Sequence, residues 1–219
     1  MDSTAEAKLG IVYIFWTMTA WSLYKFFFYG QIAALGEPTS TIVMETIRFL
    51  VFMGPIVIFI LCNIKKPWYR WLGLYGCNKG SLYKTLVVTC IYAAISLMVN
   101  IYGFHKTAHL SSIPYIFWFT TFSLSIIMEE IAFRGFLFYL FEKWNKNIVV
   151  IVTSLAFAAK HIPGWFFFPT ELSHVGFMGD FLMVFIVGSI LGYVYLATHS
   201  IWATLLVHSV NNLIVALFY

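Results

Sequence analysis

The C-terminal half of the chain carries charged and amide side chains inside strongly apolar stretches, where each of them needs a function or a partner. They are Glu129, Glu130, Arg134, Lys160, His161, His208, Asn211 and Asn212. A carboxylate beside a histidine can activate water as a general base, and histidine and asparagine can donate hydrogen bonds to a developing oxyanion. These residue types together indicate hydrolysis in an apolar environment.

The first cluster is expected to divide its two carboxylates between two tasks. Glu130 and Arg134 are four residues apart, so on a helix they share a face and can form an ion pair. Glu129 is rotated from Glu130 by about 100° and points elsewhere. One carboxylate is therefore neutralised within its own helix, and the other is available for chemistry. The alternative is a purely structural salt-bridge network.

Helix geometry predicts that Glu129 and His161 lie at the same depth. Thirteen residues separate Glu129 from Glu142, and thirteen separate Ile148 from His161. At a rise of about 1.5 Å per residue, each arm of this hairpin is about 20 Å long. A carboxylate that faces a histidine at one depth is a plausible water-activating pair. A histidine satisfied within a core is the alternative.

His208 and Asn212 are also four residues apart and share a helix face. Two donors on one face suit an oxyanion hole, although hydrogen bonding between helices is a rival explanation. The same rise, counted from Ile201, places His208 about 12 Å from the cytoplasmic start of its span, whereas Glu129 and His161 lie about 20 Å from the loop that joins their helices. His208 would therefore lie about 8 Å nearer the cytoplasm than the pair. We therefore expect His208 near the pair but not in direct contact with it.

The three clusters resemble motifs of the CAAX-protease and bacteriocin-processing family. Residues 129–135 (EEIAFRG) resemble its E-E-x-x-x-R-G motif, residues 157–161 (FAAKH) its F-x-x-x-H motif, and residues 208–212 (HSVNN) its H-x-x-x-N motif. All three occur in order, and the resemblance covers roughly residues 113 to 219. It implies an intramembrane endopeptidase that acts on a peptide or membrane-protein substrate.

The resemblance also implies roles for the individual residues. Glu129 would activate water with His161, and Glu130 and Arg134 would support them. The donors that stabilise the oxyanion would be His208 and Asn212. The compact chain is similar to the bacterial branch of the family, whose members are associated with bacteriocin maturation, self-immunity and peptide-pheromone processing.

A metal is the open chemical alternative. Glu129, His161 and His208 have the side chains of many catalytic zinc sites, which combine one glutamate with two histidines. The H-E-x-x-H arrangement is absent from the sequence, and the helix count keeps His208 away from the other two. We therefore expect a glutamate-based mechanism without a cofactor, with zinc held by these three residues as the alternative.

The composition indicates a membrane protein. Of 219 residues, 61% are hydrophobic and only 10% are charged, whereas soluble domains carry about 25% charged residues. The net charge of +4 is explained by lysines in short loops, so no nucleic-acid partner is expected. Because lipid offers the backbone no hydrogen bonds, the spans must be helical.

We therefore expect an all-α, polytopic membrane helix bundle with about seven transmembrane helices. It is predicted to form one integral membrane domain, residues 1–219, in which residues 113–219 are the catalytic core. The predicted spans are residues 11–28, 41–64, 85–104, 113–141, 148–162, 181–196 and 201–219.

The distribution of cations predicts how the chain crosses the bilayer. Lysine and arginine gather at residues 65–84 and 143–146, whereas the opposite side has only Lys106. We therefore expect a multi-pass protein of the bacterial plasma membrane with a cytoplasmic N-terminus. The aromatic and basic segment 67–75 is either an interfacial segment or a plain linker. The aromatic segment 165–169 is expected to be an interfacial anchor rather than a gate.

Two further features complete the expectations. Glu45 and Arg48 are three residues apart in the second predicted span and can simply pair, so they receive no catalytic role. The competing function is a transporter or a non-enzymatic immunity protein that uses the same buried charges as a relay. Transporters often contain internal repeats, and no repeat is visible in this sequence.

Overall fold

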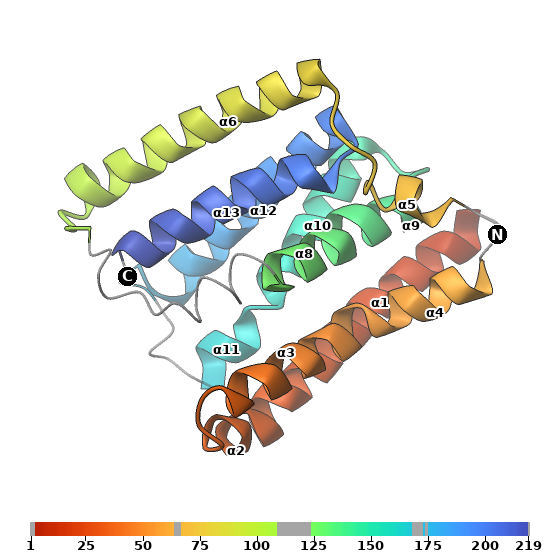
Figure 1. The fold of residues 1–219 in the computed structure, drawn as a ribbon, viewed down its shortest axis with the longest axis horizontal. Coiled ribbons are helices and arrows are strands. Elements are labelled where there is room, and N and C mark those ends of the chain that lie inside the picture. The colour runs from red at the N-terminus through yellow and green to blue at the C-terminus, as the bar shows by residue number, and fades with distance from the viewer. Residues whose placement is uncertain (1–2, 64–66, 109–123, 168–172, 174, 219) are drawn as a thin grey trace.

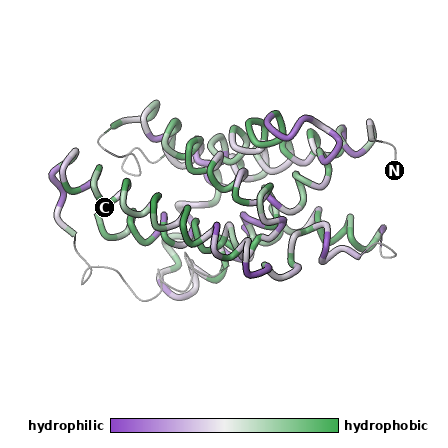
Figure 2. The backbone as a smooth tube through the Cα atoms, turned by 90° about the horizontal axis from the view of Figure 1, so that it is seen from above, coloured by the Kyte–Doolittle hydropathy of each residue, from purple (hydrophilic) through white to green (hydrophobic). Residues whose placement is uncertain are grey.

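The computed structural model describes residues 3–63, 67–108, 124–167, 173 and 175–218. Every regular element within these residues is a helix, and Figure 1 shows the longer ones arranged side by side as a bundle. Hydrophobic residues line the helices along most of their length (Figure 2). The predicted all-α fold class is therefore confirmed for the described residues.

The N-terminal part is a helical hairpin. Its elements are α1 (Ser3–Leu23), η1 (Tyr24–Phe28), α2 (Tyr29–Ala33), α3 (Thr39–Phe52) and α4 (Gly54–Cys62). The angle between α3 and α4 is 41°. Pro55 has no N–H to donate to Val51, so the helix breaks there. The indole of Trp16 on α1 donates instead to the Val51 carbonyl at 3.0 Å, and Tyr13 donates to the Phe52 carbonyl at 2.8 Å.

The remaining helices build the rest of the bundle. They are α5 (Trp68–Trp71), α6 (Lys79–Met98), η2 (Val99–Gly103), α8 (Ser125–Glu130), η5 (Ile131–Phe136), α9 (Leu137–Leu140), α10 (Lys146–Ala159), α11 (Ile162–Phe167), α12 (Gly176–Thr198) and α13 (Ile201–Phe218). Helices α10 and α12 pack closely because two glycines of α12, Gly188 and Gly192, face α10. A Cβ on Gly188 would lie 3.2 Å from the Cβ of Ser154, and one on Gly192 would lie 3.1 Å from Val150.

Four described helical stretches are long and apolar enough to cross a membrane, and the bent pair α3–α4 is a fifth if it counts as one span. The four are residues 79–103, 146–167, 176–198 and 201–218. They match predicted spans three, five, six and seven. The first predicted span is helical as α1–η1 but is not among these stretches, and the fourth begins outside the described residues. The predicted number of about seven is thus not confirmed.

The segment that follows α4 enters the bundle. Leu72 is only 2% exposed, and its carbonyl oxygen would lie 2.7 Å from a Cβ on Gly135. Gly73, at φ +70°, packs against Tyr195 and accepts a hydrogen bond from the Ile201 backbone N–H at 2.9 Å. The predicted interfacial or linker segment therefore also fixes where α13 begins, although Trp68 and Tyr69 stay exposed.

Candidate active site

The candidate site lies where α8, η5, α10 and α13 meet, in the middle of the view in Figure 1. Glu130 and Arg134 are 0% and 1% exposed, and His208 and Lys160 are 4% and 5% exposed. Glu129 and Glu130 end α8, and the π-helix η5 follows directly. Such wider turns are frequent at functional sites. Charged side chains this deeply buried require partners.

Glu130 is held by two cationic or hydrogen-bonding partners. Arg134 Nη1 lies 3.3 Å from Glu130 Oε1, which confirms the ion pair predicted from their spacing. His208 Nδ1 lies 2.7 Å from the same oxygen. Arg134 also donates from Nη2 to the Gly188 carbonyl at 3.2 Å. Glu130 and Arg134 thereby link α8 and η5 to α12 and α13.

Glu129 faces a different set of groups, as its rotation from Glu130 predicts. Its Oε1 forms an ion pair with Nζ of Lys160, the residue that directly follows α10. Its Oε2 lies 4.0 Å from His208 Nε2. The His208 ring therefore stands between the two carboxylates, with Nδ1 toward Glu130 and Nε2 toward Glu129.

The predicted offset of about 8 Å between His208 and the pair is wrong. The helix count assumed that α13 begins at the membrane surface. Ile201, the first residue of α13, is fully buried and bonds to Gly73, in the segment that packs against Gly135. Because α13 starts this deep in the bundle, seven further residues bring His208 level with the glutamates.

His161 lies beside Glu129 but is not hydrogen-bonded to it within the described residues. The two groups interact electrostatically. The His161 ring stacks on Trp165 with a centroid distance of 5.6 Å and an interplanar angle of 22°. Its Nε2 is buried and finds no hydrogen-bond partner in the described part of the chain. Lys160, the residue before His161, is instead the one that contacts the Glu129 carboxylate.

Phe157 organises the cations and histidines around it. The Arg134 guanidinium carbon lies 4.3 Å and Lys160 Nζ 4.7 Å from the centre of its ring. The rings of His161 and His208 lie 5.6 and 5.7 Å away, both edge-on. Aromatic rings attract cations through their electron-rich faces. The first residue of the F-x-x-x-H pattern therefore places the cations that balance the two glutamates.

Residues 111–214 match the family model described as type II CAAX prenyl endopeptidase Rce1-like, and the match contains all three clusters. This part of the chain is similar to the CAAX-protease family. The family is one of peptide hydrolases, and together with the apolar helices it supports a multi-pass membrane protein. No curated protein and no solved structure matches the chain.

Asn212, the last residue that the CAAX-protease resemblance singles out, points into a separate set of hydrogen bonds. Its Oδ1 accepts from Asn211 Nδ2 at 3.0 Å. Asn211 in turn accepts a hydrogen bond from Tyr92 on α6. Asn212 lies one helical turn after His208, and these bonds do not involve His208. Its role as an oxyanion donor stays a prediction.

The zinc alternative does not fit the arrangement of the described side chains at this site. A metal held by Glu129 would need its carboxylate oxygens, and the Lys160 ammonium lies against one of them. No group of three or more His, Cys, Asp or Glu side chains in the described ranges is arranged to hold a metal ion.

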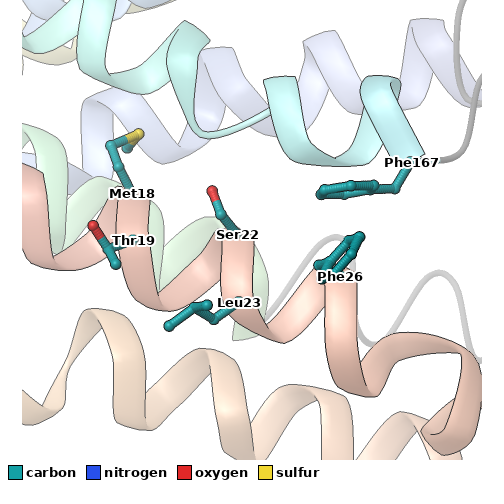
Figure 3. Close-up of a pocket in the computed structure, with 6 residues that line it drawn as sticks. All are labelled: Met18, Thr19, Ser22, Leu23, Phe26 and Phe167. Atoms are coloured by element: carbon teal, nitrogen blue, oxygen red, sulfur yellow. The ribbon is translucent and has the colours of Figure 1, made fainter.

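Helix α11 covers one side of the site. Trp165 stacks on His161, and the rings of Phe167 and Phe26 lie 4.9 Å apart. Figure 3 shows these two phenylalanines facing each other at a cavity of about 400 Å³ between α11 and the α1–η1 helix. Trp165 and Phe167 thus pack against the protein, whereas Phe166 is exposed. Residues 168 and 169, which the expected anchor also included, lie outside the described residues.

Lys160 is the functional candidate that the sequence reasoning missed. Its presence in an apolar stretch was a signal, since a buried lysine needs a counter-charge. The sequence analysis gave the role beside Glu129 to His161, because the F-x-x-x-H motif contains the histidine and leaves position 160 unspecified. Adjacent helical residues differ by about 100° in direction, so only one of the two could point at the Glu129 carboxylate.

Proposed function

We propose that the protein is an intramembrane endopeptidase that hydrolyses a peptide bond of a membrane-associated peptide or protein. The observation that carries the proposal is the different surroundings of two adjacent buried carboxylates. Glu130 is engaged by Arg134 and His208. Glu129 pairs instead with Lys160 and interacts electrostatically with His161, whose Nε2 has no partner among the described residues. Paired acids in different environments are typical of acid–base chemistry.

Water activation follows from this arrangement. A water molecule bonded to Glu129 and to His161 Nε2 would give its proton to the Glu129 carboxylate while its oxygen attacks the substrate carbonyl carbon. The tetrahedral oxyanion would accept hydrogen bonds from His208 and Asn212. The carbon–nitrogen bond then breaks, and the proton held by Glu129 passes to the departing amine. Glu130 and Arg134 would hold His208 in place.

The test is direct cleavage. The purified protein in lipid vesicles is expected to cut an internally quenched, farnesylated peptide, chosen because the matched family is described as prenyl endopeptidases. The same peptide without the farnesyl group shows whether the lipid is needed, and vesicles without protein give the background. Failure to cleave either peptide, together with transport of the intact peptide, would favour a transporter. A role in bacteriocin or pheromone processing would follow from cleavage of such peptides in cells.

We expect activity to be independent of metal, because the Lys160 ammonium already neutralises the carboxylate that a zinc ion would require. After exhaustive chelation and removal of the chelator, the rate of peptide cleavage should be unchanged. Metal analysis should find well under one equivalent of zinc per chain. Stoichiometric zinc that is lost together with activity, and restored with it, would contradict this expectation.

We expect Lys160 to position Glu129. In Lys160→Met the carboxylate loses its counter-charge in a water-poor site, so kcat should fall about tenfold or more, which corresponds to roughly 1.4 kcal/mol. Lys160→Arg keeps the charge and should recover most of the rate. Lys146→Met, an exposed change at the start of the same helix, is the matched control. A Lys160→Met protein with the original kcat would remove this role.

A further inference from the structure

A second polar cluster lies beside the candidate site and includes residues of the N-terminal hairpin. On α3, Arg48 forms an ion pair with Glu45 and a hydrogen bond with Ser125 of α8. The Arg48 guanidinium also lies 5.6 Å from the centre of the Trp21 ring on α1. Glu45 and Arg48 lie outside residues 111–214, which the family model matches. The cluster joins three helices.

The cluster faces the same space as Glu129. Ser125 precedes Glu129 by four residues on one helical stretch, so the two side chains share a face and lie about 6 Å apart along the axis. Helices α3 and α8 are in contact. Glu45 and Arg48 both interact electrostatically with Glu129. The N-terminal hairpin therefore borders the catalytic carboxylate one helical turn away.

One atom of the cluster lacks a partner. Glu45 Oε1 accepts hydrogen bonds from Arg48 and lies 3.5 Å from Ser125 Oγ. Glu45 Oε2 is buried and has no hydrogen-bond partner among the described residues, and the side chain as a whole is 13% exposed. A buried carboxylate oxygen without a donor is costly. A ligand that brings an N–H group would satisfy it.

We propose that Glu45, oriented by Arg48 and Ser125, is a subsite for the main chain of the substrate, an inference that rests on the proposed endopeptidase function. Glu45 Oε2 accepts a backbone N–H two residues from the scissile bond. An extended peptide advances about 3.3 Å per residue, so two residues span the distance of about 6 Å between the levels of Glu129 and Ser125. Inside a membrane, a peptide's own N–H groups must find such acceptors.

Binding rather than cleavage tests this subsite. The probe is the farnesylated peptide described above, in a series in which each backbone amide in turn carries an N-methyl group. Its Kd is measured with the Glu129→Gln protein in vesicles. One N-methyl position, two residues from the scissile bond, is expected to weaken binding about tenfold, because a hydrogen bond to a charged group is lost.

The same series with Glu129→Gln/Glu45→Met forms a double-mutant cycle. Glu45→Met should weaken binding of the unmodified peptide about tenfold and should make N-methylation at that position harmless. Thr46→Val, next along α3 and exposed, is the control and should leave Kd unchanged. If Glu45→Met does not fold, Glu45→Gln, a weaker neutral acceptor, should give the same pattern with a smaller change.

An unchanged Kd in the Glu45 variant, or equal sensitivity to N-methylation in both proteins, would overturn the subsite. Absence of peptide binding to the Glu129→Gln protein would do the same. These outcomes are separate from failure of the endopeptidase proposal, which would show as failure of the unmodified protein to cleave the peptide with or without the farnesyl group.

Discussion

Replacement of Glu129 by glutamine is expected to abolish peptide cleavage and leave the fold intact. The amide is nearly isosteric with the carboxylate but cannot take a proton from water. A positioned general base contributes roughly 10²–10⁴-fold to a rate, so kcat should fall by at least that lower limit. The amide oxygen can still accept a hydrogen bond from Lys160, the partner of Glu129 in the structure. Because the amide keeps this hydrogen bond although it loses the charge, the melting temperature should fall by clearly less than in Arg134→Ala.

The measurement is kcat for the farnesylated quenched peptide, with the thermal unfolding curve recorded on the same preparation. Glu142→Gln makes the same chemical change at an exposed position after α9 and should have no effect on either quantity. Full activity in a folded Glu129→Gln protein would remove the central claim, since no other residue has been assigned the task of accepting the proton from water.

Local geometry was the part of the site that the sequence could predict. The Glu130–Arg134 pair depends only on a spacing of four residues within one helix, and the structure contains it. The different direction of Glu129 also follows from helix rotation alone. Neither inference needed the position of any other helix, which explains why both agree with the structure.

The depth of His208 could not be predicted, because tertiary contacts set it. The sequence marks Ile201 as the start of an apolar run but does not show that its N–H bonds to Gly73 inside the bundle. The contact between Lys160 and Glu129 has the same character. Whether position 160 or 161 faces the carboxylate depends on the rotation of α10, which its packing against Gly188 and Gly192 determines.

The membrane spans were likewise predictable in part: their positions followed from the sequence, but a break within one of them did not. Apolar runs located the helices, but hydropathy could not predict the break at Gly54 and Pro55 or the way side chains of α1 satisfy the carbonyls there. The interruption divides one predicted span into α3 and α4. Glu45 and Arg48 lie on the first of these helices, beside the site, which is why the span is more than a hydrophobic anchor.

Arg134→Ala is expected to reduce both stability and activity, in contrast to Glu129→Gln. Arg134 pairs with Glu130, donates to the Gly188 carbonyl and lies over Phe157. Its removal leaves Glu130 buried without its guanidinium partner. Breaking a buried ion pair from one side costs about 3–5 kcal/mol, and for a chain of this size each kcal/mol lowers the melting temperature by roughly 2–4 °C.

The thermal unfolding curve in detergent, together with kcat, separates the supporting role of the Arg134–Glu130 pair from the reacting role of Glu129. Arg134→Lys, which keeps the charge but cannot reach both Glu130 and Gly188 through two nitrogens, should lie between the original protein and Arg134→Ala in melting temperature. Activity should follow stability in this pair of variants, because His208 depends on Glu130 for its orientation. If Arg134→Ala melts at the same temperature as Glu129→Gln, the division of the two carboxylates into a supporting and a reacting group is wrong.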